Sequence, residues 1–140
     1  MRIALAAAVL IGFGTGGTAA RPAQTLSVAE VVAQHNALNG RTVRVRGWIR
    51  TCHGRSCSLY ETPAGTEGRG AASSLSLGWA PDFDRRVQAL GQAQIEVEAR
   101  VRAVCFNDPM PAGVVEICAD RVDQLQHPRL VRILSRSSSN

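Results

Sequence analysis

The sequence predicts a mainly β protein with one helix before its first strand and another between its third and fourth strands. Two stretches carry most of this prediction. Apolar and charged residues alternate over residues 43–50 and again over residues 95–102. A period of two is typical of a half-buried strand, because successive side chains leave opposite faces of the sheet. The 140 residues suffice for one domain with a single modest core.

The first twenty residues have the features of an export signal. Arg2 precedes an apolar run from Ile3 to Phe13, and small residues follow as far as Ala20. This order is that of a secretory signal peptide, and the run is shorter than the roughly 20 residues of a membrane-spanning helix. We therefore expect residues 1–20 to be the signal and residues 21–128 the domain, with a C-terminal tail over 129–140. The predicted protein is soluble, has no membrane anchor and is periplasmic; the alternative is full secretion.

The four cysteines are those of a disulfide-bonded exported protein. Four cysteines permit three pairings, and local pairing fits best: Cys52 with Cys57 across a short turn, and Cys105 with Cys118 across a loop. A zinc site built from cysteines and His53 is the alternative. The spacing lacks the paired CxxC knuckles of structural zinc sites, so we predict neither a metal nor a cofactor.

The segment after the signal predicts a helix that leads into the first strand. Ser27 and Glu30 have the spacing of a capping box, in which each side chain bonds the backbone N–H of the other. The helix is expected to fray at His35, whose side chain would face solvent near the negative end of the helix. The pair Asn39-Gly40 then supplies a turn.

The first predicted strand has two distinct faces. One face holds Val43, Val45, Gly47 and Ile49, and the other holds Arg44, Arg46, Trp48 and Arg50. A second strand is expected over Cys57–Glu61 and a third over Leu75–Trp79. The stretch between them, residues 62–74, is rich in glycine, serine and threonine and predicts a mobile loop.

The second helix is predicted over Ala80–Gly91, because Phe83, Val87 and Leu90 recur on one face. The fourth strand is expected over Ile95–Cys105 and the fifth over Val114–Leu125. If the fourth strand lies antiparallel to the first, its outward residues Glu96 and Glu98 face the arginines of the first strand. Opposite charges across strands stabilise by roughly 0.2–1 kcal/mol a pair, and arginines paired in this way are not free for an anionic ligand.

All the basic residues are arginine. Without the signal, fifteen arginines minus eleven acidic residues leave a net charge of +4. A moderately basic surface favours anionic partners such as nucleic acid or polysaccharide. The competing interpretation is that most of these arginines are solvated or paired.

The segment Val43-Arg44-Val45-Arg46-Gly47-Trp48-Ile49 resembles the first strand of OB-fold anticodon-binding and related nucleic-acid-binding domains. The helix at Ser27, followed by Asn39-Gly40 and this strand, resembles small exported bacterial proteins of OB-fold type. The resemblance implies a five-stranded OB-fold-like barrel with a helix between strands 3 and 4. It also implies a ligand face across the second and third strands, bordered by two loops. In this chain a predicted disulfide fastens each loop.

The candidate ligand contacts on that face are Trp48, His53, Arg55, Tyr60, Trp79 and Phe106. Proteins that bind single-stranded nucleic acid combine a basic groove with aromatic stacking platforms. Aromatic side chains also serve burial, so the alternative is that these residues fill core positions. No Ser-His-Asp order, metal-ligand run or glycosidase-like carboxylate pair can be assembled, so no catalytic residue is predicted.

We therefore predict a non-enzymatic binding or interaction module that uses the barrel face and its two stapled loops to bind an envelope protein. The first alternative is a protein that binds nucleic acid or anionic oligosaccharide through Arg44, Arg46, Arg55 and the aromatic residues. The second alternative is an enzyme with an unrecognised site, for which His53 would be the residue to replace. The oligomeric state is not predicted.

Overall fold

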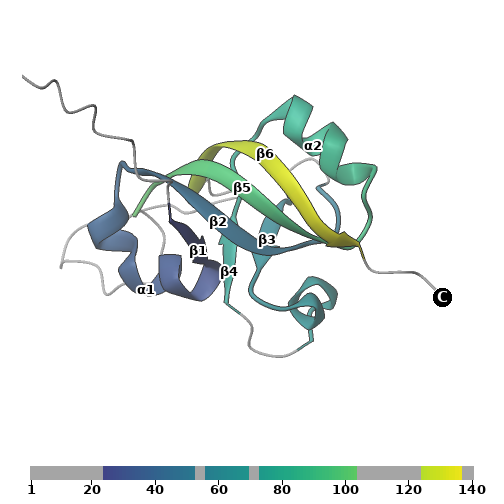
Figure 1. Ribbon diagram of the computed structural model, residues 1–140, viewed down its shortest axis with the longest axis horizontal. Coiled ribbons are helices and arrows are strands. Elements are labelled where there is room, and N and C mark those ends of the chain that lie inside the picture. Colours follow the sequence, from purple (N-terminus) through teal and green to yellow (C-terminus); the bar gives the residue numbers. More distant parts are fainter. Residues whose placement is uncertain (1–23, 53–55, 70–72, 104–123, 137–140) are drawn as a thin grey trace, which may run out of the picture.

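The computed structural model describes residues 24–52, 56–69, 73–103 and 124–136 (Figure 1). Their elements, in chain order, are β1 (Thr25–Ser27), α1 (Val28–Leu38), β2 (Thr42–Ile49), β3 (Ser58–Tyr60), the 3-10 helix η1 (Pro63–Glu67), β4 (Ser74–Ser76), α2 (Pro81–Gln88), β5 (Ala93–Val101) and β6 (Leu125–Arg136). The prediction of a mainly β chain is confirmed. Among the described residues, no helix has the length and apolar character needed to cross a membrane.

One sheet contains all six described strands. Its order is β4-β3-β2-β5-β6, and β1 pairs with the free part of β2. All pairs are antiparallel except β1 with β2. The two ends of the sheet meet at one point, where Leu77 and Leu125 form an isolated parallel bridge and the Gly78 N–H donates to the Leu125 carbonyl at 2.9 Å. The described residues form no ladder that closes the sheet, so the five-stranded barrel stays a prediction.

The core lies against the inward face of β2 and β5, as their alternation predicts. Val45 and Ile49 of β2 are fully buried, as are Ile95 and Val97 of β5. Gly47 shares this inward face. A Cβ atom at Gly47 would lie 2.6 Å from Leu59 Cγ and 2.9 Å from the Tyr60 carbonyl oxygen, closer than packed atoms approach. Glycine is therefore required where β3 crosses β2.

Helix α1 begins with the predicted capping box. The Ser27 hydroxyl accepts from the Glu30 N–H at 3.1 Å, and the Glu30 carboxylate accepts from the Ser27 N–H at 2.7 Å. The prediction for His35 is wrong: its side chain is buried, and Nδ1 lies 2.6 Å from the Val32 carbonyl oxygen. The helix continues regularly to Leu38, which places His35 on the same inward stripe as Val28 and Val31.

Helix α2 lies beside β6 at one end of the sheet (Figure 1). Pro81 occupies its first turn, where a missing N–H costs nothing. Phe83 and Val87 point into the core, as predicted, and Leu90 is half-buried beyond the end of the helix. The N-terminus of α2 therefore meets the start of β6, and this junction positions the candidate site.

The stretch between the second and third strands differs from its prediction as a loop. Residues 63–67 form η1, capped by the Thr62 hydroxyl, which accepts from the Gly65 N–H at 3.3 Å. The Gln92 amide holds this turn against the start of β5 by donating to the Pro63 carbonyl at 3.1 Å and to Thr66 Oγ1 at 2.7 Å. Residues 70–72 of the predicted loop lie outside the described residues.

The last strand also differs. The strand predicted over Val114–Leu125 lies almost entirely outside the described residues, and β6 contains residues 129–136, which were expected in a tail. The pairing of β6 with β5 has register shifts at three places. Each shift breaks the period of two, so the sequence of β6 does not alternate like that of β2.

Candidate functional site

A groove of about 440 Å³ lies where the start of α2 meets the start of β6. Of its lining residues, Phe83, Pro128 and Leu130 are buried, while Trp79 and Pro81 are exposed. The lining is therefore largely apolar and includes two proline rings, which lose little freedom when a ligand packs on them.

Trp79 is the most exposed large apolar residue of the described chain. Its side chain is 72% exposed. The residue directly before it, Gly78, is tied to β6 by the hydrogen bond to Leu125, and Pro81 begins α2 two residues later. The backbone on both sides of Trp79 is therefore fixed, so the indole is presented at the groove by a rigid connection.

The rim of the groove carries more positive than negative charge. Asp82 forms an ion pair with Arg85, and Arg129 forms one with Glu98. Arg86 lines the groove, is exposed, and forms no ion pair with any residue in the described ranges. A guanidinium that has no ion pair among the described residues therefore lies beside an apolar groove, an arrangement that suits a ligand with both an apolar group and a carboxylate.

His127 is the other polar side chain on the rim. Its φ of 50° lies in the left-handed region, and Pro128 follows it. A non-glycine residue in this region is uncommon. Here it falls where the register of β6 with β5 shifts, between Gln126 and Arg129.

The structure separates the sequence-predicted site residues into two places. Trp48 of β2 and Tyr60 of β3 are directly paired, and both are half-buried. Neither of them lines the groove beside Trp79. The other predicted contacts, His53, Arg55 and Phe106, lie outside the described residues.

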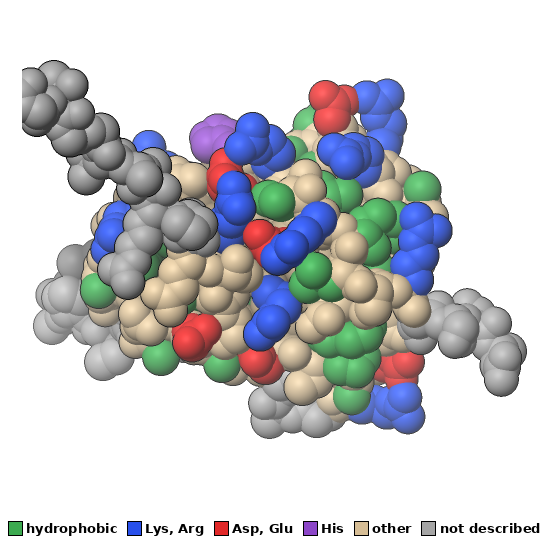
Figure 2. Space-filling view, in the orientation of Figure 1, with side chains coloured by type: hydrophobic (Ala, Val, Ile, Leu, Met, Phe, Trp, Pro, Cys, Tyr) green, Lys and Arg blue, Asp and Glu red, His purple; other side chains and the backbone are tan. Residues whose placement is uncertain are grey.

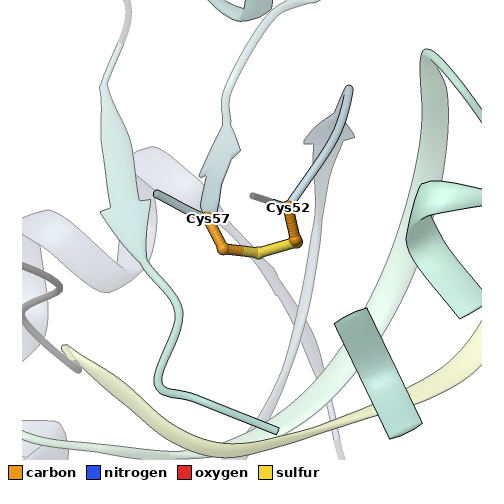
Figure 3. Close-up of a disulfide and its surroundings, with 2 residues drawn as sticks. All are labelled: Cys52 and Cys57. Carbon is orange, nitrogen blue, oxygen red and sulfur yellow. A yellow bond between two sulfur atoms is a disulfide. The ribbon is translucent and has the colours of Figure 1, made fainter. Parts of the chain in front are cut away.

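The predicted disulfide between Cys52 and Cys57 is present (Figure 3). It joins the chain just after β2 to the chain just before β3, with a Cα–Cα distance of 4.4 Å and both side chains buried. An Asp84 carboxylate oxygen and the two sulfur atoms lie within 4.8 Å of one another. Because the sulfur atoms are bonded to each other, this cluster offers a metal ion only the carboxylate. Cys105 and Cys118 lie outside the described residues.

The predicted pairing of charges across strands is also present, and it extends further than expected. Arg44 Nε lies 3.4 Å from Glu98 Oε2, and Arg44 also reaches Glu96 at 3.9 Å. On the other side of β5, Arg129 pairs with Glu98 and Arg132 with Glu96, at 2.8 Å for the second pair. The hydrogen bond from Arg129, followed by the one from Arg44, lowers the pKa of Glu98 below its usual 4.5 although partial burial opposes this. Figure 2 shows basic and acidic side chains interleaved across this face.

Most of the groove was not predicted from the sequence. Trp79 was expected as a ligand contact, Phe83 only as part of the buried helix face, and Arg86 in no role. Pro128 and Leu130 were expected at the end of the domain and in the tail. The one local signal is the Pro81 that follows Trp79 so closely, since a proline at a helix start fixes the preceding residues in extended conformation. Comparison of the chain with protein-family models, with curated proteins and with solved structures finds no match.

Proposed function

We propose that this protein is an exported binding module with an OB-fold-like barrel, and that it binds an extended peptide segment of an envelope protein in the groove between α2 and β6. The observation that carries the proposal is the 72% exposure of Trp79 above that groove. A tryptophan held in water by a rigid backbone buries a large apolar area when a partner covers it. Tryptophan and arginine are also the residues most enriched among the energetic centres of interfaces.

The order of the strands supports the proposal of an OB-fold-like barrel. An OB-fold is a partly open five-stranded barrel. Here β4, β3, β2, β5 and β6 lie side by side in that order, and the Leu77–Leu125 bridge brings the last strand back to the chain that leaves β4. The disulfide between Cys52 and Cys57 and the signal-like first twenty residues support export to an oxidising compartment, for which we propose the periplasm.

The edge of β6 favours an extended peptide as the ligand. Within the described ranges, residues 129–136 pair with β5 on one side and with no described strand on the other. An uncovered strand edge offers N–H and C=O groups that an extended peptide can use, while pockets beside the edge select its side chains. The groove lies beside the start of this edge. A peptide along β6 would therefore place an apolar side chain against Trp79 and Phe83, and an acidic one within reach of Arg86.

The experiment is a selection of 12-residue peptides on the oxidised protein without its signal, followed by affinity measurements with Trp79→Ala, Arg86→Gln and Trp48→Ala. We expect peptides that combine an apolar and an acidic residue. Trp79→Ala should weaken them by about 30-fold, the effect of losing roughly 2 kcal/mol at an interface centre. Trp48→Ala is the matched control, since it removes the same side chain from the face that the sequence favours. The proposal would be contradicted by peptides that bind the Trp79→Ala variant with the same affinity as the unmodified protein. It would also be contradicted by peptides whose binding requires Trp48 instead.

A further inference from the structure

The outward face of β2, β5 and β6 carries an excess of arginine over glutamate. Cross-strand pairing places its residues side by side: Arg44 opposite Glu98, Arg46 opposite Glu96, and on the far side of β5 Glu96 opposite Arg132 and Glu98 opposite Arg129. The charged residues at outward positions are Arg44, Arg46, Arg100, Arg129 and Arg132 against Glu96 and Glu98. Among the described residues of these three strands, five positive and two negative charges leave +3 on this face.

The ion pairs hold the guanidinium groups in place without using all their donors. Each guanidinium has five N–H donors, and each carboxylate accepts at about four sites. Arg44, Arg129 and Arg132 therefore bring about fifteen donors to about eight acceptor sites on the two glutamates. The surplus donors face outward, because the side chains of Arg129 and Arg132 are 72% and 64% exposed.

Arg46 adds a charge that nothing in the described ranges neutralises. It is exposed, lies between Arg44 and Trp48 on β2, and forms no ion pair with a described residue. Its cross-strand neighbour Glu96 pairs instead with Arg132, whose Nε donates to one carboxylate oxygen at 2.9 Å and whose Nη2 lies 2.8 Å from the same oxygen. Within the described part of the chain, Arg46 and the outer donors of Arg129 thus stay available to an anionic ligand.

From this arrangement we propose that the outward face of β2, β5 and β6, the arginine face, binds a linear phosphate polymer through the phosphate groups alone. Planar guanidinium groups match the geometry of phosphate oxygens, and fixed arginines lose less freedom on binding than mobile ones. The described outward positions of the arginine face hold one aromatic, Trp48, at the end of β2. Proteins bind single-stranded nucleic acid tightly where several aromatic side chains stack on its bases. With one aromatic residue, the arginine face offers contacts to the phosphate charges of a polymer but little stacking for bases.

This surface overlaps the Trp79 groove at Arg129, so variants at other residues test the two proposals independently. The arginine face lies over the middle of the sheet, whereas the groove lies where α2 meets the start of β6. Arg129 belongs to both. Arg46 belongs only to the arginine face, which makes it the residue to test.

The test measures binding of inorganic polyphosphate to the oxidised protein over a range of salt concentrations. Affinity should fall steeply with salt, because each phosphate contact releases condensed counterions. Arg46→Gln should weaken binding about fivefold at low salt and reduce the logarithmic salt slope by about 0.7, the value of one contact to a single-stranded polyanion. Arg69→Gln is the control, since it removes the same charge from an exposed arginine that follows η1 and pairs with Glu67.

Four results would overturn the proposal. The first is no binding of polyphosphate at low salt, and the second is an equal loss in Arg46→Gln and Arg69→Gln, which would indicate a diffuse effect of net charge. The third is an affinity for an oligonucleotide that exceeds the affinity for a polyphosphate of equal phosphate number by more than about tenfold, since the face would then also contact the bases. The fourth is binding only to vesicles of anionic lipid, which would assign the face to a membrane surface.

Discussion

Arg132 approaches a single carboxylate oxygen of Glu96 with two nitrogens: Nε donates to it at 2.9 Å, and Nη2 lies 2.8 Å from it in an ion pair. Arg132 thus covers a glutamate that is only 2% exposed on the outer face of the sheet. The carboxylate has lost most of its contact with water and keeps a more distant partner, Arg44, at 3.9 Å. Charge-assisted hydrogen bonds to a covered group are among the stronger ones in proteins. This pair joins β5 to β6 where the register of the two strands shifts.

Replacing Arg132 with glutamine should lower the free energy of unfolding by about 1–3 kcal/mol, because the Glu96 carboxylate would lose its close charged partner and keep only the distant Arg44. Arg129→Gln should cost less than about 1 kcal/mol, since Glu98 is more exposed and keeps Arg44. Urea unfolding of both variants measures the difference. Equal losses would mean that coverage of Glu96 does not matter.

Gly47→Ala should destabilise the fold by about 1–3 kcal/mol through overpacking. The added Cβ would lie 2.8 Å from Val28 Cγ2 and 2.6 Å from Leu59 Cγ, and it would also meet backbone at Tyr60. Gly68→Asn is the control: Gly68 has a φ of 70° with open space around it, and asparagine tolerates that region. Thermal and urea unfolding would check this, and a Gly47→Ala variant as stable as Gly68→Asn would contradict the close approach of β3 to β2.

The stability of the protein should fall in acid partly because of Glu98. Its pKa is lowered in the folded state, mainly by the hydrogen bond from Arg129. The stabilisation is therefore complete above the usual pKa of 4.5 and is lost as the pH falls through the folded-state value. Glu98→Gln should lose less stability than the unmodified protein between neutral pH and about pH 3. Parallel curves for the two proteins would show that this carboxylate does not contribute.

The disulfide should stabilise the fold although its loop is short. Closing a loop between cysteines separated by five positions removes unfolded-state entropy worth about 2 kcal/mol. The double variant Cys52→Ala/Cys57→Ala should show that loss in urea unfolding under oxidising conditions. It should also respond less to a reductant than the unmodified protein. A double variant of unchanged stability would mean that the two ends of this turn are held by packing alone.

The sequence predicted best what depends on local pattern. The alternation in β2 and β5, the capping box at Ser27 and the disulfide across a short turn each involve neighbours in the chain, so their signals are complete within a few residues. The pairing of glutamates on β5 with arginines on β2 followed from the alternation, once the two strands were set antiparallel. The five-stranded barrel remains a prediction.

The features that were missed depend on residues far apart in the chain. His35 reads as a polar residue near a helix end, and only the continuation of α1 to Leu38 turns it inward. β6 was not predicted because its register shifts remove the period of two, and because His127 and Pro128 resemble the end of a strand. The groove was missed for the same reason, since the β6 residues of its lining, among them Pro128 and Leu130, meet the residues around the start of α2 only when β6 lies beside α2.

The most direct test of the proposed function follows the two tryptophan indole N–H signals by NMR while a selected peptide is added. The chain has only Trp48 and Trp79, so the Trp79→Phe variant assigns both signals. We expect the Trp79 signal to move in proportion to bound peptide and the Trp48 signal to stay in place. A shift of the Trp48 signal with the Trp79 signal unchanged would place the ligand on the face of β2 and β3 instead. If neither signal moved, both surfaces would be excluded as the peptide site.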